Sequence, residues 1–143
     1  MINTDYVPEW YITPFEHSKY TLARNQMHMD LLFDDMDDSD EFLSLGCPAQ
    51  VDYYEDGRHC IVQLGETQDK SLIIVHGLLL HEAVHIWQRT KHLMGEREPS
   101  IEFEAYSIQR IAQDLFAMYE ESETHDQKQS STQSGKSLGW ETC

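Results

Sequence analysis

Basic residues are scarce in this sequence. Ten Lys and Arg stand against 26 Asp and Glu, so the formal net charge at pH 7 is −16 over 143 residues. A surface of this charge repels the phosphate backbone of nucleic acids and anionic membranes, and we expect neither as a partner. The hydrophobic content of 40% is too high for a wholly disordered acidic chain, so the composition predicts one folded domain.

Long hydrophobic runs and a basic leader are also missing. The most apolar stretch, residues 72–80, is interrupted by His76 and Gly77 and is much shorter than a membrane span. The first 18 residues contain no Lys or Arg, unlike a signal peptide. The three cysteines (Cys47, Cys60 and Cys143) are scattered without metal-ligand spacing. These features predict a cytoplasmic protein.

The pattern along the chain predicts an α+β domain over residues 1–121, followed by a polar tail over 122–143. Thr13 and Pro14 are typical of a helix start, and we expect a long helix over residues 13–36. The acidic run at 34–41 lacks the glycine and the distal Glu of an EF-hand loop, which favours a solvated loop over a calcium site.

Residues 48–66 alternate with a period of two around Glu55-Asp56-Gly57, which predicts a β-hairpin. Because two strands alone are marginally stable, the hairpin must lie on a helix or pair with a third strand. Helical spacing follows over residues 69–94, with Asp69 as the N-cap and Gly95 after the end. A last helix is predicted from about residue 99 to 121.

The chemistry-bearing motif is His81-Glu82-Ala83-Val84-His85, an HExxH pattern inside the second predicted helix. Two histidines four residues apart project from one helix face and can both bind one zinc ion. The glutamate after the first histidine then stands beside the metal as a general base for water. The pattern therefore predicts a zinc site on His81 and His85, with Glu82 as the catalytic residue.

A catalytic zinc needs a third protein ligand. The metzincin extension is excluded, because Gln88 and Lys91 occupy the places where it requires a glycine and a histidine. At 100° per residue, Glu104 falls on the apolar arc of the last predicted helix, whereas Glu102 lies on the opposite side. A carboxylate on a buried face needs a cation. Zinc is one candidate, and an arginine (Arg89, Arg97 or Arg110) is the alternative.

HExxH followed by 18 residues and a glutamate resembles the gluzincin metallopeptidases, in the spacing of the aminopeptidase-N-like branch, over residues 72–115. The short chain also resembles small single-domain metallopeptidases of phages and prophages. This resemblance implies a small zincin-like domain that hydrolyses a peptide or protein substrate. It also implies one zinc ion on His81, His85 and Glu104, with Glu82 as general base. The strand over residues 60–64 would then hold an extended substrate at a sheet edge.

The sequence departs from the thermolysin-like pattern at one place. Ile108 stands where an Asp orients a zinc-bound histidine, so Ser107 or Gln109 would have to substitute. No motif fixes the group that stabilises an oxyanion, and the candidates are Tyr53, Tyr54, Tyr106, His76 and His92. Two alternatives to a hydrolase stay open: an inactive zinc-binding interaction protein, and an acidic decoy that binds a basic partner.

Overall fold

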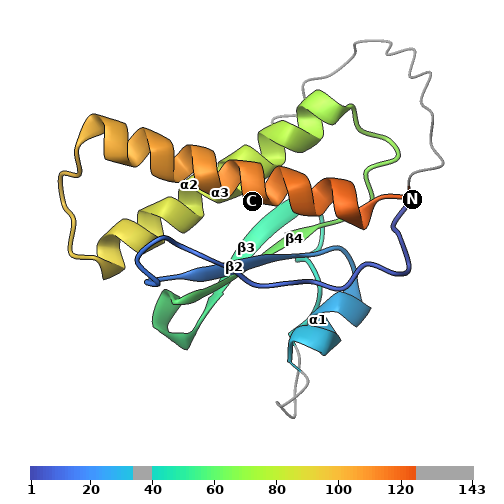
Figure 1. Cartoon of the computed structure of the whole chain (residues 1–143). Helices are drawn as coiled ribbons and strands as arrows, with labels where there is room; N and C mark the ends of the chain where they lie inside the picture. The colour runs from blue at the N-terminus through green and yellow to red at the C-terminus, as the bar shows by residue number, and fades with distance from the viewer. Residues whose placement is uncertain (34–39, 125–143) are drawn as a thin grey trace.

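The structure, a computed structural model, describes residues 1–33 and 40–124. It contains a four-stranded sheet and three α-helices, as an α+β domain requires (Figure 1). The elements in chain order are β1 (Tyr11–Ile12), β2 (Lys19–Ala23), α1 (Gln26–Leu32), β3 (Ala49–Tyr54), the 3-10 turn η1 (Glu55–Gly57), β4 (His59–Leu64), α2 (Leu72–Leu93) and α3 (Ile101–Ser122). The predicted fold class is therefore confirmed.

The strands lie in the order β1-β2-β4-β3. β2 pairs with β4 in parallel, and the two outer pairs are antiparallel. α2 and α3 cross one face of the sheet, and α1 lies on the opposite side (Figure 1). Strand alternation divides the core accordingly. Cys60, Val62 and Leu64 of β4 belong to the large cluster under α2 and α3, whereas Ile61 packs with Met29 of α1.

The long N-terminal helix predicted over residues 13–36 is wrong. β2 occupies its centre, and α1 is limited to Gln26–Leu32, capped by Asn25. A single helix over these residues would place Leu22 and Met29 on one face, seven residues apart, but they pack on opposite faces of the sheet, and Phe15 is exposed. β2 has only five residues and pairs with β4, which is remote in sequence, so most of its strand character comes from contacts that the local sequence does not show.

The hairpin prediction is confirmed, and β2 supplies the third strand. The predicted position of the strand over residues 60–64 is wrong, however. β4 lies inside the sheet between β2 and β3, so the strand at this end of the sheet is β3. β3 also contacts α2, the helix that carries the HExxH motif.

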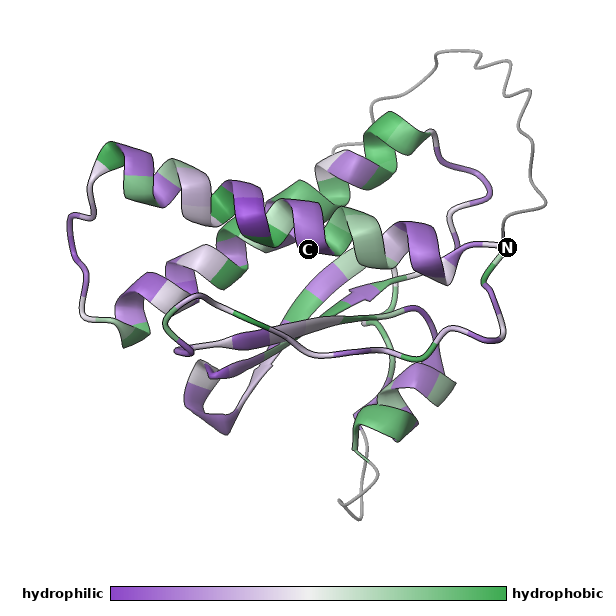
Figure 2. Cartoon of the chain, viewed as in Figure 1, coloured by the Kyte–Doolittle hydropathy of each residue, from purple (hydrophilic) through white to green (hydrophobic). Residues whose placement is uncertain are grey.

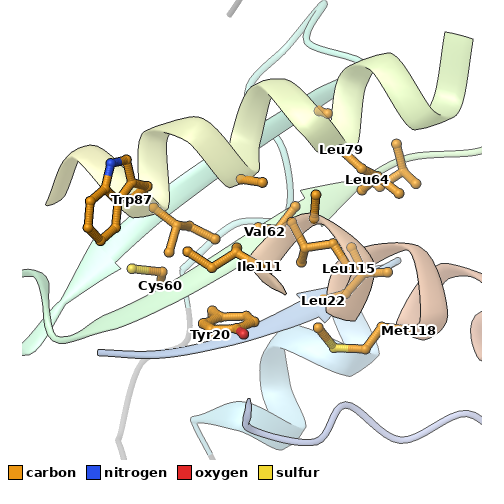
Figure 3. Close-up of a cluster of buried hydrophobic side chains, with 14 of the residues drawn as sticks. Tyr20, Leu22, Cys60, Val62, Leu64, Leu79, Trp87, Ile111, Leu115 and Met118 are labelled. Carbon is orange, nitrogen blue, oxygen red and sulfur yellow. The ribbon is translucent and has the colours of Figure 1, made fainter. Parts of the chain in front are cut away.

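The two long helices agree with their predicted ranges. Ser71 caps α2 by accepting a hydrogen bond from the Ile74 amide, so the predicted N-cap, Asp69, is wrong. Gly95 follows the last turn with a φ of +73°, a conformation that favours glycine. Figure 3 shows the core beneath these helices, where Trp87 and Leu79 of α2 meet Ile111 and Leu115 of α3 above the sheet.

Not every apolar residue of α2 serves the core. The first turn of α2 is hydrophobic (Figure 2). Its residues Leu72 and Ile73 are 57% and 81% exposed. Within residues 1–33 and 40–124, no helix is long and apolar enough to cross a membrane. Most of the acidic run at 34–41 and most of the predicted tail lie outside the described residues.

A buried guanidinium joins the ends of several elements. Arg24, 1% exposed, follows β2 and donates hydrogen bonds to the carbonyl oxygens of Leu64 and Gly65 after β4. It also donates to Ser122 Oγ and to Glu123 Oε1 at the end of α3. Because burial of an unpaired charge is costly, this full set of acceptors is what allows Arg24 to lie in the interior.

We predict that Glu123→Gln destabilises the fold at pH 7 by about 1–3 kcal/mol, the usual contribution of hydrogen bonds to a charged group. Burial alone would raise the pKa of the Glu123 carboxyl. Hydrogen bonds from Thr67 Oγ1 and the Met1 ammonium, together with the charge of Arg24, outweigh burial, so the pKa is lowered overall. A carboxyl with a lowered folded pKa stabilises the protein above its unfolded pKa, and this contribution disappears as pH falls through the folded value. The destabilisation measured by urea unfolding should be smaller at pH 3 than at pH 7. The exposed neighbour Glu120→Gln is the control, and an equal effect of both variants would contradict the prediction.

Candidate functional site

His81 and His85 lie one turn apart on the outer face of α2, and the structure brings them together as predicted. Their Nε2 atoms are 3.1 Å apart, and the two rings stand nearly perpendicular, at 82°. Helical periodicity places residues four apart on one face, which accounts for the approach. The pair therefore presents two imidazole nitrogens to one point in space.

Gln88 orients the second histidine, a role that the sequence analysis did not assign. His85 Nδ1 lies 3.0 Å from Gln88 Oε1, and an amide oxygen can only accept a hydrogen bond. His85 Nδ1 therefore carries the proton, and its Nε2 lone pair faces His81. The i,i+3 spacing of His85 and Gln88 on one helix is a sequence signal that identifies this contact.

Glu82 lies on the inner side of the same turn, with 3% of its surface exposed. Burial raises the pKa of its carboxyl group to about 7, against an opposing effect of His85, and the charge of Asp52 adds to the increase. In the part of the chain that the structure describes, no group donates a hydrogen bond to this carboxyl. Glu82 is therefore an acid–base group poised near neutral pH beside His85.

Glu104 lies elsewhere. Its Oε2 accepts hydrogen bonds from Trp87 Nε1 at 2.9 Å and from Lys91 Nζ at 3.4 Å. Trp87 follows His85 by about 200° around α2, so this donor lies on the side opposite the histidine pair. The hydrogen bond from Trp87, together with the charge of Lys91, lowers the pKa of Glu104 against a smaller opposing effect of burial.

The helical-wheel argument for Glu104 fails because the start of α3 extends beyond the core. Ile101, on the same predicted arc, is 84% exposed, and the side chain of Glu104 is 39% exposed. The cation beside Glu104 is Lys91, which was not among the predicted arginine partners. Within residues 1–33 and 40–124, no three His, Cys, Asp or Glu side chains group as a metal site. The structure thus assembles two of the three predicted ligands.

Two of the five oxyanion candidates lie near the histidine pair. A shallow hollow of about 400 Å³, the His85 hollow, is lined by Tyr53, His85, Gln88, Arg89 and His92. Tyr53 and His92 therefore have access to a group bound beside His85. The hydroxyl of Tyr54 instead donates to Asp40, and the ring of His76 stacks on Phe116.

A more enclosed cavity lies on the other side of α2. It has a volume of about 360 Å³, and its walls include Phe15, Trp87, Phe103 and Tyr106. Ser107 and Gln109, the predicted substitutes for an orienting Asp, also line this cavity and not the His85 hollow. The cavity is therefore separate from the histidine pair.

Comparison of the chain with protein-family models, curated proteins and solved structures finds no match. The chemistry of the site therefore has to be inferred from its geometry.

We predict that replacing Glu82 with Gln becomes more favourable for the stability of the metal-free protein, compared with the wild type, as the pH rises from 4 to 8. The folded pKa of about 7 exceeds the usual unfolded value of about 4.3. The folded state therefore binds more protons between these values, and wild-type stability falls as pH rises through this window. The free energy of unfolding of Glu82→Gln, measured relative to that of the wild type, should increase by about 1–3 kcal/mol between pH 4 and pH 8.

Urea unfolding across this pH range measures the effect. Glu102→Gln is the matched control, because Glu102 is exposed. Identical pH dependence of the wild type and Glu82→Gln would show that burial does not shift this carboxyl.

Proposed function

We propose that this protein is a metal-dependent peptide-bond hydrolase in which His81 and His85 hold one zinc ion and Glu82 transfers protons. The observation that carries the proposal is the convergence of the two Nε2 atoms, 3.1 Å apart, on the turn whose inner side carries Glu82. A peptide or protein is the proposed substrate.

The histidine pair fits a zinc ion. Two nitrogens bound to one tetrahedral zinc at the usual bond length lie about 3.3 Å apart, close to the separation found here. Gln88 holds His85 in the tautomer that leaves Nε2 free to bind a metal. The hydrogen bond between the two Nε2 atoms then requires His81 to donate, and a cation would take the place of that proton.

The fit is limited to two protein ligands, since Glu104 hydrogen-bonds to Trp87 on the opposite side of α2. We therefore propose a site with two histidines whose remaining positions are open to water and substrate. Such a site binds zinc more weakly than one with three protein ligands, and the bound fraction depends on the zinc concentration.

A zinc ion at this pair would supply Lewis-acid polarisation of a peptide carbonyl. Glu82 has the position for proton transfer, because its carboxyl lies beside His85 and is buried with no competing hydrogen bond from the described residues. It can accept a proton from an attacking water and return it to the leaving amine. β3, the terminal strand of the sheet, places Tyr53 in the His85 hollow and offers an extended substrate a backbone edge.

We predict that the wild type binds one zinc ion per chain in calorimetric titrations and that His81→Ala and His85→Ala each abolish saturable binding. Gln88→Ala should weaken binding roughly 10–100-fold, the usual cost of losing a group that orients a ligand. Glu104→Gln should leave binding unchanged. His76→Ala, on the same helix but stacked on Phe116, is the control. Equal zinc binding by the wild type and both histidine variants would refute the assigned site.

We predict further that the zinc-loaded wild type cleaves members of a fluorogenic peptide library. Glu82→Gln should lower kcat/KM by about 100-fold or more, the typical contribution of general acid–base catalysis, and keep its zinc affinity. Glu102→Gln should match the wild type. Zinc binding by a wild type that cleaves no peptide would instead favour the inactive zinc-binding interaction protein.

A further inference from the structure

Arg89 has an unusual environment. It lies one turn after His85, and its guanidinium carbon is 4.4 Å from the centre of the Tyr53 ring. Its aliphatic part runs against Gly57 in the turn between β3 and β4, where an added Cβ would lie 2.6 Å from Arg89 Cδ. Gly57 also has a φ of +89°, so both the turn and the contact favour glycine. The hairpin turn and Tyr53 together fix the position of the guanidinium group.

The charge of Arg89 has no counterpart among the residues that the structure describes. Within the described ranges 1–33 and 40–124, no carboxylate pairs with it and no oxygen accepts a hydrogen bond from it. Arg24 and Arg110 both have acidic partners, whereas Arg58 and Arg97 are exposed. Arg89 is therefore the partly buried arginine whose N–H donors are oriented and unused.

The surroundings of Arg89 favour an anion. The residues that line the His85 hollow include no Asp or Glu, although the chain carries 26 of them. The cation–π contact with the Tyr53 ring uses none of the N–H donors of the guanidinium group. An arginine in this arrangement offers the fork of parallel donors that matches a carboxylate.

We propose that Arg89 binds the terminal carboxylate of the substrate, so that the protein removes residues from the C-terminal end of peptides. This inference rests on the proposed hydrolase function. The backbone positions of His85 and Arg89 are one helical turn apart, about 5.4 Å along α2, and both side chains line the His85 hollow. A carboxylate held on Arg89 therefore places the C-terminal end of an extended peptide in the hollow beside His85.

The first test measures binding to the metal-free protein, which does not require activity. The probes are acetyl-alanyl-phenylalanine with a free carboxylate and the same compound as its C-terminal amide. The free acid should bind the wild type roughly 10–100-fold more tightly than the amide, as expected for a charge-assisted pair. Arg89→Met should remove that preference, and Arg89→Lys should restore part of it. Arg97→Met, at an exposed arginine after α2, should behave as the wild type.

Two results would overturn the inference: equal binding of acid and amide by the wild type, or an acid preference that persists in Arg89→Met. Inorganic phosphate is tested in parallel. Binding of phosphate through Arg89 without binding of the free acid would assign the site to a phosphoryl group and refute the carboxylate.

Cleavage assays separate this inference from the proposed function. Zinc-loaded wild type should cleave free-acid peptides with a kcat/KM at least about 10-fold above that of the matched amides, and Arg89→Met should erase the difference. Equal cleavage of both peptide forms by wild type and variant would refute the role of Arg89 and leave the hydrolase intact. Arg89-dependent binding of the free acid without any cleavage would refute the hydrolase and leave the carboxylate site intact.

Discussion

The buried guanidinium of Arg24 is the interaction on which the arrangement of this domain depends. It connects the end of β2 to the carbonyl groups after β4 and to the last residues of α3. A charged group in the interior is stable only when its donors are satisfied, so these three segments must meet in one geometry. The parallel pairing of β2 with β4 and the position of α3 over the sheet follow from this requirement.

α2 serves two purposes on its two sides. Its inner side contributes Leu79, Ile86 and Trp87 to the main core, and its outer side carries His81 and His85. Glu82 belongs to the inner side, so the packing of the helix withdraws its carboxyl from water. The same burial that raises the pKa of Glu82 costs stability once the carboxyl is charged.

The sequence predicted the second half of the chain much better than the first. The hairpin and the two long helices have local signals: alternation around the Glu55-Asp56-Gly57 turn, helical spacing and Gly95. β2 has only five residues, and its partner β4 is remote in sequence. Its register with β4 is set by tertiary packing, which no local pattern records.

The candidate site shows the same division. The approach of His81 and His85 follows from helix geometry alone, and Gln88 obeys the same rule. The position of Glu104 does not follow from helix geometry. A helical wheel gives the angle of Glu104 around α3, but it does not say which side of α2 the helix α3 packs against. The sequence offered Arg89 only as a partner of Glu104. Its position against Gly57 could not be predicted, because that contact exists only once the hairpin turn lies against α2.

The hairpin and α2 also have a consequence for the order of folding. All the residues to which we assign chemistry, from Tyr53 to Arg89, lie in one continuous stretch of chain, whereas β2 reaches β4 only by closing a long loop. Short loops close at lower entropic cost than long ones, so contacts between the hairpin and α2 are favoured early. Insertion of β2, and with it the enclosure of Arg24, then completes the domain. We therefore expect the hairpin and α2 to form contacts first, and β2 and the other N-terminal residues to join them later.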